Sequence, residues 1–373
     1  MPLGATLCEP PAPPRAAATA ARCAGSRQRR ERRSLLIGIA ACTLALLASG
    51  LAWKLTPLRE RRLAVADVRP PAGHEHYLAY DGFALDHYVL YFGLDQRATQ
   101  RLRAADVLIL GNSRLMFAMR PDNLRAHFAG HGQSYYVLGF GHGERDRFPR
   151  AIIERFDLRP EWVVVNADGF FVDELSDFAR SVVQAFPLKA RATYYERCLD
   201  NAVRRAVHRC IPHWVSIAQQ RREYLIYRSR EDGTWLIEAV PGEHVGFTPQ
   251  SGEQDITPRE LAAARQFQQT LAGHGTQLIL TCVPGPDVNP RRAARLAAAL
   301  GVPLIYPELD NLATCDGSHL TPDSATRFVS AFLRELDAFW ASHAAWADEV
   351  ACESVRPERA PRATAAHSRR LRH

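Results

Sequence analysis

A serine, an aspartate and a histidine occur in settings that suit nucleophilic chemistry. The apolar residues Val107 to Leu110 lead directly into Gly111-Asn112-Ser113, and a later segment reads CDGSHLTPDSATRF, with Asp316 and His319 three positions apart. A neutral imidazole can take the proton of a serine hydroxyl, and a carboxylate on the other ring nitrogen fixes the tautomer and stabilises the imidazolium. These three residues could therefore carry out acyl chemistry if the fold brings them together.

Each of the two segments also has a simpler explanation. A glycine and a serine after a strand are typical of an ordinary turn with a capping serine, and an Asp-Gly-Ser turn can carry an incidental histidine. The catalytic interpretation requires both segments to lie at one edge of a parallel sheet, where the carboxyl ends of the strands form ligand sites. There, Gly111 allows a sharp turn, and the N–H of Ser113 at the start of the next helix could bind an oxyanion.

The elements that must position these residues alternate along the chain from residue 105 onward. Helix-like stretches separate the apolar runs, and two of these helices have clear start signals: Thr257-Pro258-Arg259-Glu260 fits a capping box, and Thr321-Pro322-Asp323 fits a threonine cap with proline at the first helical position. Strands that alternate with helices predict a mostly parallel sheet covered on both faces, an α/β fold of three α/β/α layers. The apolar runs are 107–110, 135–138, 162–165, 277–284 and 302–307.

The two chemical segments resemble a known superfamily. ILGNSR near the start and DGSHLTPDSATRF near the end are similar to the first and last blocks of the SGNH (GDSL-like) hydrolases, and the resemblance covers about residues 105–338. It implies an SGNH/flavodoxin-like sandwich that needs no cofactor, with Ser113 as nucleophile, His319 as base and Asp316 as its orienting carboxylate. It also implies an oxyanion donor from a glycine after the second strand, for which we prefer Gly141, with Gly143 next.

The third block of the chain departs from the family pattern. The family places roughly Gly-x-Asn-Asp after an apolar strand, whereas this chain reads WVVVNADGFF. Counting from the strand puts Asp168 at the position of the asparagine, with Asn166 two residues earlier. An ionised aspartate cannot donate a hydrogen bond. Either Asn166 supplies the oxyanion donor through a shifted register, or Asp168 has another role, or only backbone donors remain.

An apolar stretch near the N-terminus predicts a membrane anchor. Leu35 to Trp53 comprises 19 residues without a charge, which as a helix would span roughly 28 Å, about the thickness of a bilayer core. Five arginines between residues 27 and 33 precede it and four basic residues follow between 54 and 62. The positive-inside rule thus favours a cytoplasmic N-terminus and a periplasmic body on the inner or plasma membrane. A cleaved signal peptide and a buried soluble helix are the alternatives.

The basic character of the chain is concentrated in its two ends. Residues 1–34 carry seven Arg and two Glu, a net of +5, and residues 354–373 carry six Arg and one Glu, again +5; the total is +7, so the remainder is 7 − 10 = −3. A charge distributed in this way does not form a stripe on the folded body, which argues against nucleic-acid binding. We expect residues 1–34 and 341–373 to be disordered basic tails.

The remaining chain divides into a connector and one large domain. Residues 54–103 are expected to form a juxtamembrane connector whose aromatic segment, residues 77–92, packs on the body or binds a sugar face. Residues 104–340 are expected to form the SGNH-like domain, with an insertion at about 185–256. That insertion reads as a helix and a hairpin turning at Asp232-Gly233. It could be a lid or substrate platform, or an addition at the edge of the sheet.

No metal or cofactor is predicted. His74 and His76 are spaced like a metal pair but lack nearby acids at ligand spacing, and the glycine-rich segment GFGHGERDR lacks the GK[ST] ending of a phosphate loop. The cysteines show no CxxC spacing. If the body is exported, Cys198–Cys210 and Cys282–Cys315 are candidate disulfides.

These features together lead to two functional hypotheses. The first is a serine-dependent acyl-ester hydrolase or O-acyltransferase that acts on an exported, cell-envelope carbohydrate, since anchored members of the superfamily are often linked to such chemistry. Its partners would be an acylated carbohydrate or other ester, the membrane, and a membrane acyl-donor protein. The second is a non-catalytic envelope-binding or assembly protein on a degenerate version of the fold.

Overall fold

The computed structural model describes residues 75–80, 83–141, 143–210, 226–236, 245–250, 252 and 254–354. The predicted tail 1–34, the predicted membrane helix 35–53, the first part of the connector and residues 355–373 lie outside these ranges. Within them, no helix combines the length and the apolar character that crossing a bilayer requires.

Five parallel strands form the central sheet, in the spatial order β3-β2-β4-β8-β9. In register, Leu110 of β2 lies between Leu138 of β3 and Val165 of β4. Every residue of β2, β3 and β4 is buried, as expected for a parallel sheet covered on both faces. The fold is therefore α/β with a parallel sheet, as predicted. The strands are β2 (Val107–Gly111), β3 (Tyr135–Gly139), β4 (Trp162–Asn166), β8 (Gln277–Thr281) and β9 (Leu304–Ile305).

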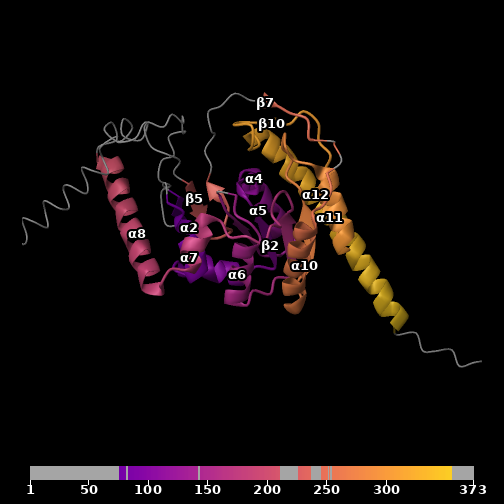
Figure 1. Cartoon of the computed structure of the whole chain (residues 1–373), viewed down its shortest axis with the longest axis horizontal. Coiled ribbons are helices and arrows are strands. Elements are labelled where there is room, and N and C mark those ends of the chain that lie inside the picture. The colour runs from indigo at the N-terminus through magenta and orange to yellow at the C-terminus, as the bar shows by residue number, and fades with distance from the viewer. Residues whose placement is uncertain are drawn as a thin grey trace, which may run out of the picture. The chain divides into compact units, whose positions relative to one another are not determined.

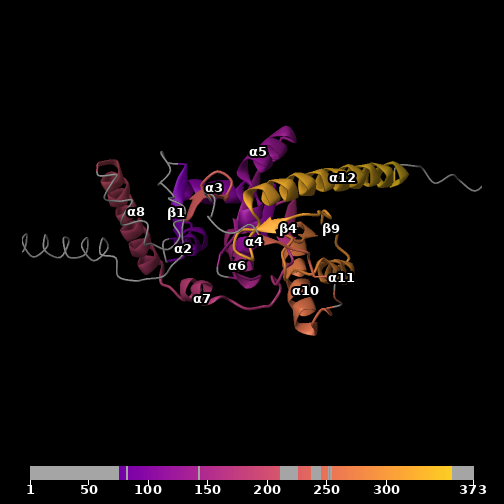
Figure 2. The ribbon, with the colours of Figure 1, turned by 90° about the horizontal axis from the view of Figure 1, so that it is seen from above.

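Side chains alternate between two hydrophobic clusters on the two faces of the sheet. Leu108 and Leu110 of β2 join one cluster, whereas Val107 and Ile109 join the other, because successive residues of a strand point to opposite faces. Helices cover both faces, and Figure 2 shows α5 and α12 on one side of β4 with α10 on the other. One face carries α4 (Ser113–Ala118), α5 (Pro121–Gly130) and α12 (Pro322–Ser354); the other carries α6 (Arg147–Phe156), α10 (Pro258–Gly273) and α11 (Pro290–Leu300).

Both predicted helix starts are present. The hydroxyl of Thr257 accepts a hydrogen bond from the N–H of Glu260 at 3.1 Å, and the hydroxyl of Thr321 accepts one from the N–H of Ser324 at 3.3 Å. The last helix is longer than expected. It continues to Ser354, past residue 340 where we placed the start of the tail, and Trp340 still packs against the apolar face of the sheet.

The region assigned to a connector belongs to the folded body from residue 75 onward. It contains β1 (His76–Tyr80), α2 (Leu85–Phe92) and α3 (Gln96–Arg103). Tyr88 and Leu90 of α2 are buried in the main core, so the aromatic segment packs on the body. The boundary expected at residue 104 is thus not a structural boundary.

The insertion supplies one helix and short antiparallel pairings, and α7 (Asp177–Val183) precedes it. Its elements are α8 (Pro187–Cys210), β5 (Ile226–Ser229), β6 (Trp235–Leu236) and β7 (Val245–Gly246). The predicted hairpin is confirmed, with Arg228 opposite Trp235, and β1 extends it to a three-stranded sheet. β7 pairs with β10 (Ala313–Thr314), and Figure 1 shows this pair near the start of α12.

The hairpin covers the outer edge of β3, the edge strand of the central sheet. The N–H of Val137 donates to the carbonyl of Asp232 at 2.8 Å. The fully buried guanidinium of Arg228 donates to the carbonyls of Val137 and Gly139 and pairs with Asp86 of α2. Backbone groups that an open edge would expose are satisfied in this way.

Candidate active site

Ser113 lies where β2 gives way to α4. Asn112 caps this helix, its side-chain oxygen accepting from the N–H of Arg114 at 3.1 Å, so Ser113 is the first helical residue. Gly111 is required by close packing: a Cβ there would come within 2.9 Å of Leu115 Cβ and 3.0 Å of Asn166 Cβ. The glycine therefore allows the chain to turn beside β4 and present the serine at the carboxyl edge of the sheet.

Asp316 and His319 lie in a tight loop between β10 and α12. The N–H of Cys315 donates to the carbonyl of His319 at 2.9 Å, and the N–H of Thr321 donates to the carbonyl of Ala313 at 2.9 Å, which closes the loop at its base. Gly317 adopts a left-handed φ of +79°, a conformation that favours glycine. The loop is thus held by its own backbone, by β7 and by the start of α12.

The two segments meet as the catalytic interpretation requires. His319 Nε2 lies 2.9 Å from the hydroxyl oxygen of Ser113, and its Nδ1 lies 2.6 Å from Asp316 Oδ2. The other carboxylate oxygen of Asp316 accepts from the N–H groups of Ser318 and His319 at 2.9 and 2.8 Å. A carboxylate, an imidazole and a hydroxyl are therefore connected in one hydrogen-bonded chain, the order that proton transfer from a serine needs.

The surroundings of this chain favour an ionised Asp316 and a fixed imidazole. Burial alone would raise the pKa of Asp316, but the hydrogen bonds from His319 and the N–H of Ser318 outweigh it and hold that pKa below its usual value. The ring of Phe117 stacks on His319, with centroids 4.1 Å apart, and Trp235 of the hairpin lies edge-on to Phe117 at 6.4 Å. The insertion thus contributes to the wall beside the histidine.

Gly141 follows the end of β3, next to the strand that leads into Ser113. Gly111 and Gly139 are register partners, so Gly141 and Ser113 each lie two residues beyond them. In the part of the chain that the structure describes, neither the N–H of Gly141 nor that of Ser113 has a hydrogen-bond acceptor. Both amides are available to a ligand. Gly143 is further along, in a left-handed turn with a φ of +65°.

Asn166, one of the alternatives for an oxyanion donor, has hydrogen-bond partners within the fold. It ends β4 level with Gly111, two residues short of Ser113, and is fully buried. Its Nδ2 donates to Asn112 Oδ1 at 3.3 Å, and its Oδ1 accepts from the N–H of Val283 at 3.0 Å. The side chain therefore joins the ends of three strands.

Asp168, at the position of the family asparagine, pairs with an arginine that our sequence reasoning missed. Arg114 forms an ion pair with Asp168, contacts both oxygens of Asp287 at 2.6 and 2.7 Å, and donates to Ser318 Oγ at 3.2 Å. Burial raises the pKa of Asp168 above its usual value even though Arg114 opposes the change. A signal was present: an arginine in the first turn of a helix is unfavourable beside the dipole unless a carboxylate compensates it.

A polar pocket opens beside Asp168. Charged and amide side chains dominate its lining, and one of its ion pairs joins Arg292 to Glu260 at 2.5 Å. The pocket is small, about 30 Å³, which is room for about one water molecule, and its lining favours a polar group over an apolar one. The polar residues of the lining are Asp168, Gln254, Glu260, Asp287, Asn289 and Arg292.

The structure tests one of the two predicted disulfides. Cys282 and Cys315 are unpaired thiols, which corrects the predicted bridge. Cys282 belongs to the cluster on one face of the sheet, whereas Cys315 lies in the histidine loop, whose neighbours Leu312 and Leu320 pack on the opposite face. The side chain of Cys210 lies outside the described residues, so the pairing with Cys198 stays a prediction.

One group of side chains could hold a metal, although we predicted none. His127, His131 and Asp337 place three possible ligand atoms within 4.8 Å of one another, away from the serine. Of the histidines that we weighed for a metal, His76 lies in β1 and His74 lies outside the described residues.

Comparison of the chain with protein-family models, with curated proteins and with solved structures finds no match in any of the three.

Proposed function

We propose that the protein is a serine-dependent acyl-ester enzyme, a hydrolase or an O-acyltransferase, built on an SGNH-like α/β/α sandwich. The observation that carries this proposal is the hydrogen-bonded chain from Ser113 through His319 to Asp316. These residues come from segments about two hundred positions apart, at the edge of the sheet where parallel α/β folds bind ligands. A capping serine and a loop histidine without a shared role would not be expected to form such a hydrogen-bonded chain.

The reaction begins with attack of Ser113 Oγ on the carbonyl carbon of an ester, while His319 Nε2 takes the hydroxyl proton. The tetrahedral intermediate collapses when the imidazolium returns that proton to the leaving alcohol, and an acyl-serine remains. Water or a sugar hydroxyl then attacks the acyl carbon and gives its proton to Nε2. The bond from the acyl carbon to Ser113 Oγ then breaks, the imidazolium returns its proton to that oxygen, and the acid or the new ester is released. Asp316 holds the imidazole throughout.

The oxyanion of the intermediate is held by backbone amides. The N–H groups of Ser113 and Gly141 have no other acceptor among the described residues, and each follows the end of one of two neighbouring strands. Asp168, paired with Arg114, takes no part as a donor. A missing side-chain donor costs about 10² to 10³ in rate in enzymes where one was removed, so we expect a slow turnover of simple esters.

The substrate class that fits best is an acylated carbohydrate. The small pocket beside Asp168 is lined by carboxylates, amides and an arginine, which suit a polar group of such a substrate. Export of the body by the helix 35–53 would bring it to cell-envelope glycans, with the membrane and a membrane acyl-donor protein as partners. A reporter enzyme fused after Trp53 tests this orientation. If a reporter that functions only in the cytoplasm is active there, the predicted export of the body is wrong.

A second candidate is a non-catalytic envelope-binding protein. It is favoured by the loss of the side-chain oxyanion donor, because Asn166 is engaged and Asp168 is an acid. In that case the serine and histidine would be a remnant, and the polar pocket would be the functional part.

Labelling with a serine-directed fluorophosphonate separates the two candidates. We expect one adduct on Ser113, located by mass spectrometry, in the full chain and its absence from Ser113→Ala and His319→Ala. Ser318→Ala is the matched control. It removes a hydroxyl group from the same loop, and that hydroxyl group makes no hydrogen bond to His319 among the described residues. Absence of an adduct from the folded native protein would support the non-catalytic candidate.

The response of ester cleavage to an added acceptor then distinguishes a hydrolase from a transferase. With p-nitrophenyl acetate as donor, a transferase should release nitrophenol faster when an oligosaccharide acceptor is added, and a hydrolase should not respond to it.

A further inference from the structure

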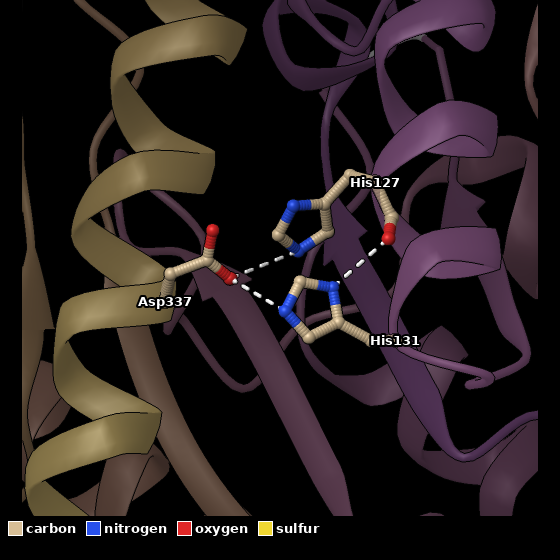
Figure 3. Close-up of side chains that lie close together, drawn as sticks. All are labelled: His127, His131 and Asp337. Carbon is tan, nitrogen blue, oxygen red and sulfur yellow. Dashed lines mark hydrogen bonds and ion pairs between the residues drawn. The ribbon is translucent and has the colours of Figure 1, made fainter.

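Two histidines and an aspartate from different helices converge beside the apolar face that α5 and α12 cover. His127 lies in the last turn of α5, and His131 caps its end. Figure 3 shows Asp337 of α12 directed toward both rings, and its Oδ1 lies 3.6 Å from His127 Nε2 and 3.2 Å from His131 Nε2. A single carboxylate oxygen thus faces two imidazole nitrogens.

The hydrogen bond of His131 to a carbonyl shows which of its two ring nitrogens carries the hydrogen in the neutral form. Its Nδ1 lies 2.9 Å from the carbonyl oxygen of His127, which can only accept, so Nδ1 carries the hydrogen. In the neutral ring the lone pair is then on Nε2 and points toward Asp337 Oδ1, another acceptor. Two acceptors at this separation repel unless a proton or a cation lies between them.

His127 adds a third atom of the same kind. Its Nε2 and the Oδ1 of Asp337 are both shielded from solvent, and neither has a hydrogen-bond partner among the residues that the structure describes. Burial lowers the pKa of His127, and His131 adds to this effect while Asp337 opposes it. One proton can bridge only one of the two imidazoles to the carboxylate, whereas one cation can bind all three atoms.

The donor set and spacing match a small transition-metal ion. Bonds of about 2.0–2.1 Å from Zn²⁺ to imidazole nitrogen and carboxylate oxygen imply about 3.3–3.4 Å between ligand atoms of a tetrahedron. The two nitrogen–oxygen separations, 3.2 and 3.6 Å, are close to this value. Imidazole with carboxylate suits Zn²⁺, Ni²⁺ or Co²⁺, whereas Mg²⁺ and Ca²⁺ prefer oxygen ligands alone. The side chains of His131 and Asp337 are half-exposed, which leaves a side open for a water ligand.

We propose that His127, His131 and Asp337 bind one Zn²⁺ ion, which joins α5 to α12. The carbonyl of His127 holds the ring of His131 in the orientation for binding, as an outer partner of a ligating histidine commonly does. Asp337 lies 15 residues after Pro322, about 22 Å along α12 from its start. The ion therefore acts as a clamp between helices, at a distance from the serine site.

Calorimetric titration with ZnCl₂ tests the site directly. The protein should be the full chain, carry no histidine tag, and be stripped with a chelator beforehand. We expect one saturable site in the native protein and affinity at least about tenfold weaker in Asp337→Asn and His131→Ala. Glu335→Gln is the matched control, because it removes a carboxylate from the same turn of α12, and it should bind as the native protein does. Thiols and histidines elsewhere in the chain are common to all variants and cancel in the comparison.

Trp340 provides a second readout. Its ring centroid lies 6.1 Å from those of His127 and His131, so Ni²⁺ bound there should quench its fluorescence. The quenching should saturate, and it should disappear in Trp340→Phe and in Asp337→Asn. If Asp337→Asn loses its far-UV circular dichroism, the partly exposed His131→Gln takes its place. No saturable binding to the native protein, or equal binding by the native protein and the ligand variants, overturns the proposal and leaves an ordinary ion pair.

Discussion

Asp316 is the residue that holds the histidine of the candidate active site in place. One of its oxygens binds the Nδ1 of His319, and the other accepts two backbone N–H groups of its own loop. These bonds hold the pKa of the carboxyl below its usual value, so Asp316 stays ionised where it must stabilise an imidazolium. The same bonds fix the proton of the neutral ring on Nδ1 and leave Nε2 to accept from Ser113.

Asp316→Asn should abolish most reactivity of Ser113 while the fold is retained. An amide can donate to Nδ1, which favours the tautomer with its hydrogen on Nε2 and deprives Ser113 of its base. We expect the rate of fluorophosphonate labelling to fall about 10⁴-fold, the effect of this change on turnover in a well-studied triad. Asp323→Asn, which removes a carboxylate from the first turn of α12, is the control. A labelling rate that is equal in native protein and Asp316→Asn would show that the aspartate does not orient the base.

At the scale of elements, the hairpin of the insertion is a structural part of the sheet. Its turn accepts a hydrogen bond from β3, and its buried Arg228 satisfies two further carbonyls of that strand. One of these carbonyls belongs to Gly139, which lies two residues before the proposed oxyanion donor Gly141. The hairpin therefore supports the loop that carries Gly141 and, through Trp235 and Phe117, the wall beside His319.

Gly233→Ala should separate the hairpin from the sheet. Gly233 has a φ of +71°, and an added Cβ would fall against the carbonyl oxygen of Val137 and within 2.6 Å of the ring of Tyr136. Left-handed strain costs about 1–2 kcal/mol, and overpacking a further 1–3 kcal/mol. We expect the free energy of unfolding, measured with urea, to fall by about 2–5 kcal/mol.

Gly275→Ala is the matched control for this substitution. Gly275 has nearly the same φ, +75°, but no atom lies within 4 Å of a Cβ added there, so only the strain of about 1–2 kcal/mol applies. Equal losses in the two variants would mean that the hairpin turn does not pack tightly on β3.

At the scale of the whole molecule, a buried charge network joins α2 to the core. His87 of α2 contacts Asp86 at 2.8 Å and Glu144 at 3.2 Å, and Asp86 also pairs with Arg228. Burial opposes a charged imidazole, but the two carboxylates outweigh it and raise the pKa of His87 to about 9. The segment that we took for a connector is thus bound to the body by charge as well as by apolar packing.

This network predicts that the protein loses stability in mild alkali. A histidine has a pKa of about 6.5 in the unfolded chain, so the raised value in the fold contributes stability that is complete below about pH 6.5. The contribution is lost as pH rises through about 9. Its full size is on the order of 3 kcal/mol, since each pKa unit corresponds to about 1.4 kcal/mol.

Urea unfolding at several pH values between 6 and 10 measures this loss. The free energy of unfolding of the native protein should decline across the range, and His87→Gln should be less stable at pH 6 but show a flatter curve. His274→Gln, at the C-terminal end of α10, should keep the native slope. A native curve that is flat between pH 6 and 10 would mean that His87 is neutral in the fold.

The local features of this protein followed from its sequence. The strands 107–110, 135–138 and 162–165, the caps at Thr257 and Thr321 and the turn at Asp232-Gly233 depend on residues within one turn or one strand of each other. Apolar period, capping chemistry and turn preference act over that range. The serine and the Asp-His pair could be recognised because each also lies at the end of such an element.

The pairing of distant segments was decided only by the tertiary structure. The order and register of the strands brought Asp168 to Arg114. Packing extended α12 past residue 340 and joined residues 75–103 to the body. It also placed Asp337 beside His127 and His131 at the end of α5. A shift of one residue in register turns each side chain to the other face of a sheet, and no local pattern encodes which carboxylate an arginine or a histidine will meet. For this protein, the sequence determined the elements and the reactive residue types, and the fold determined their partners.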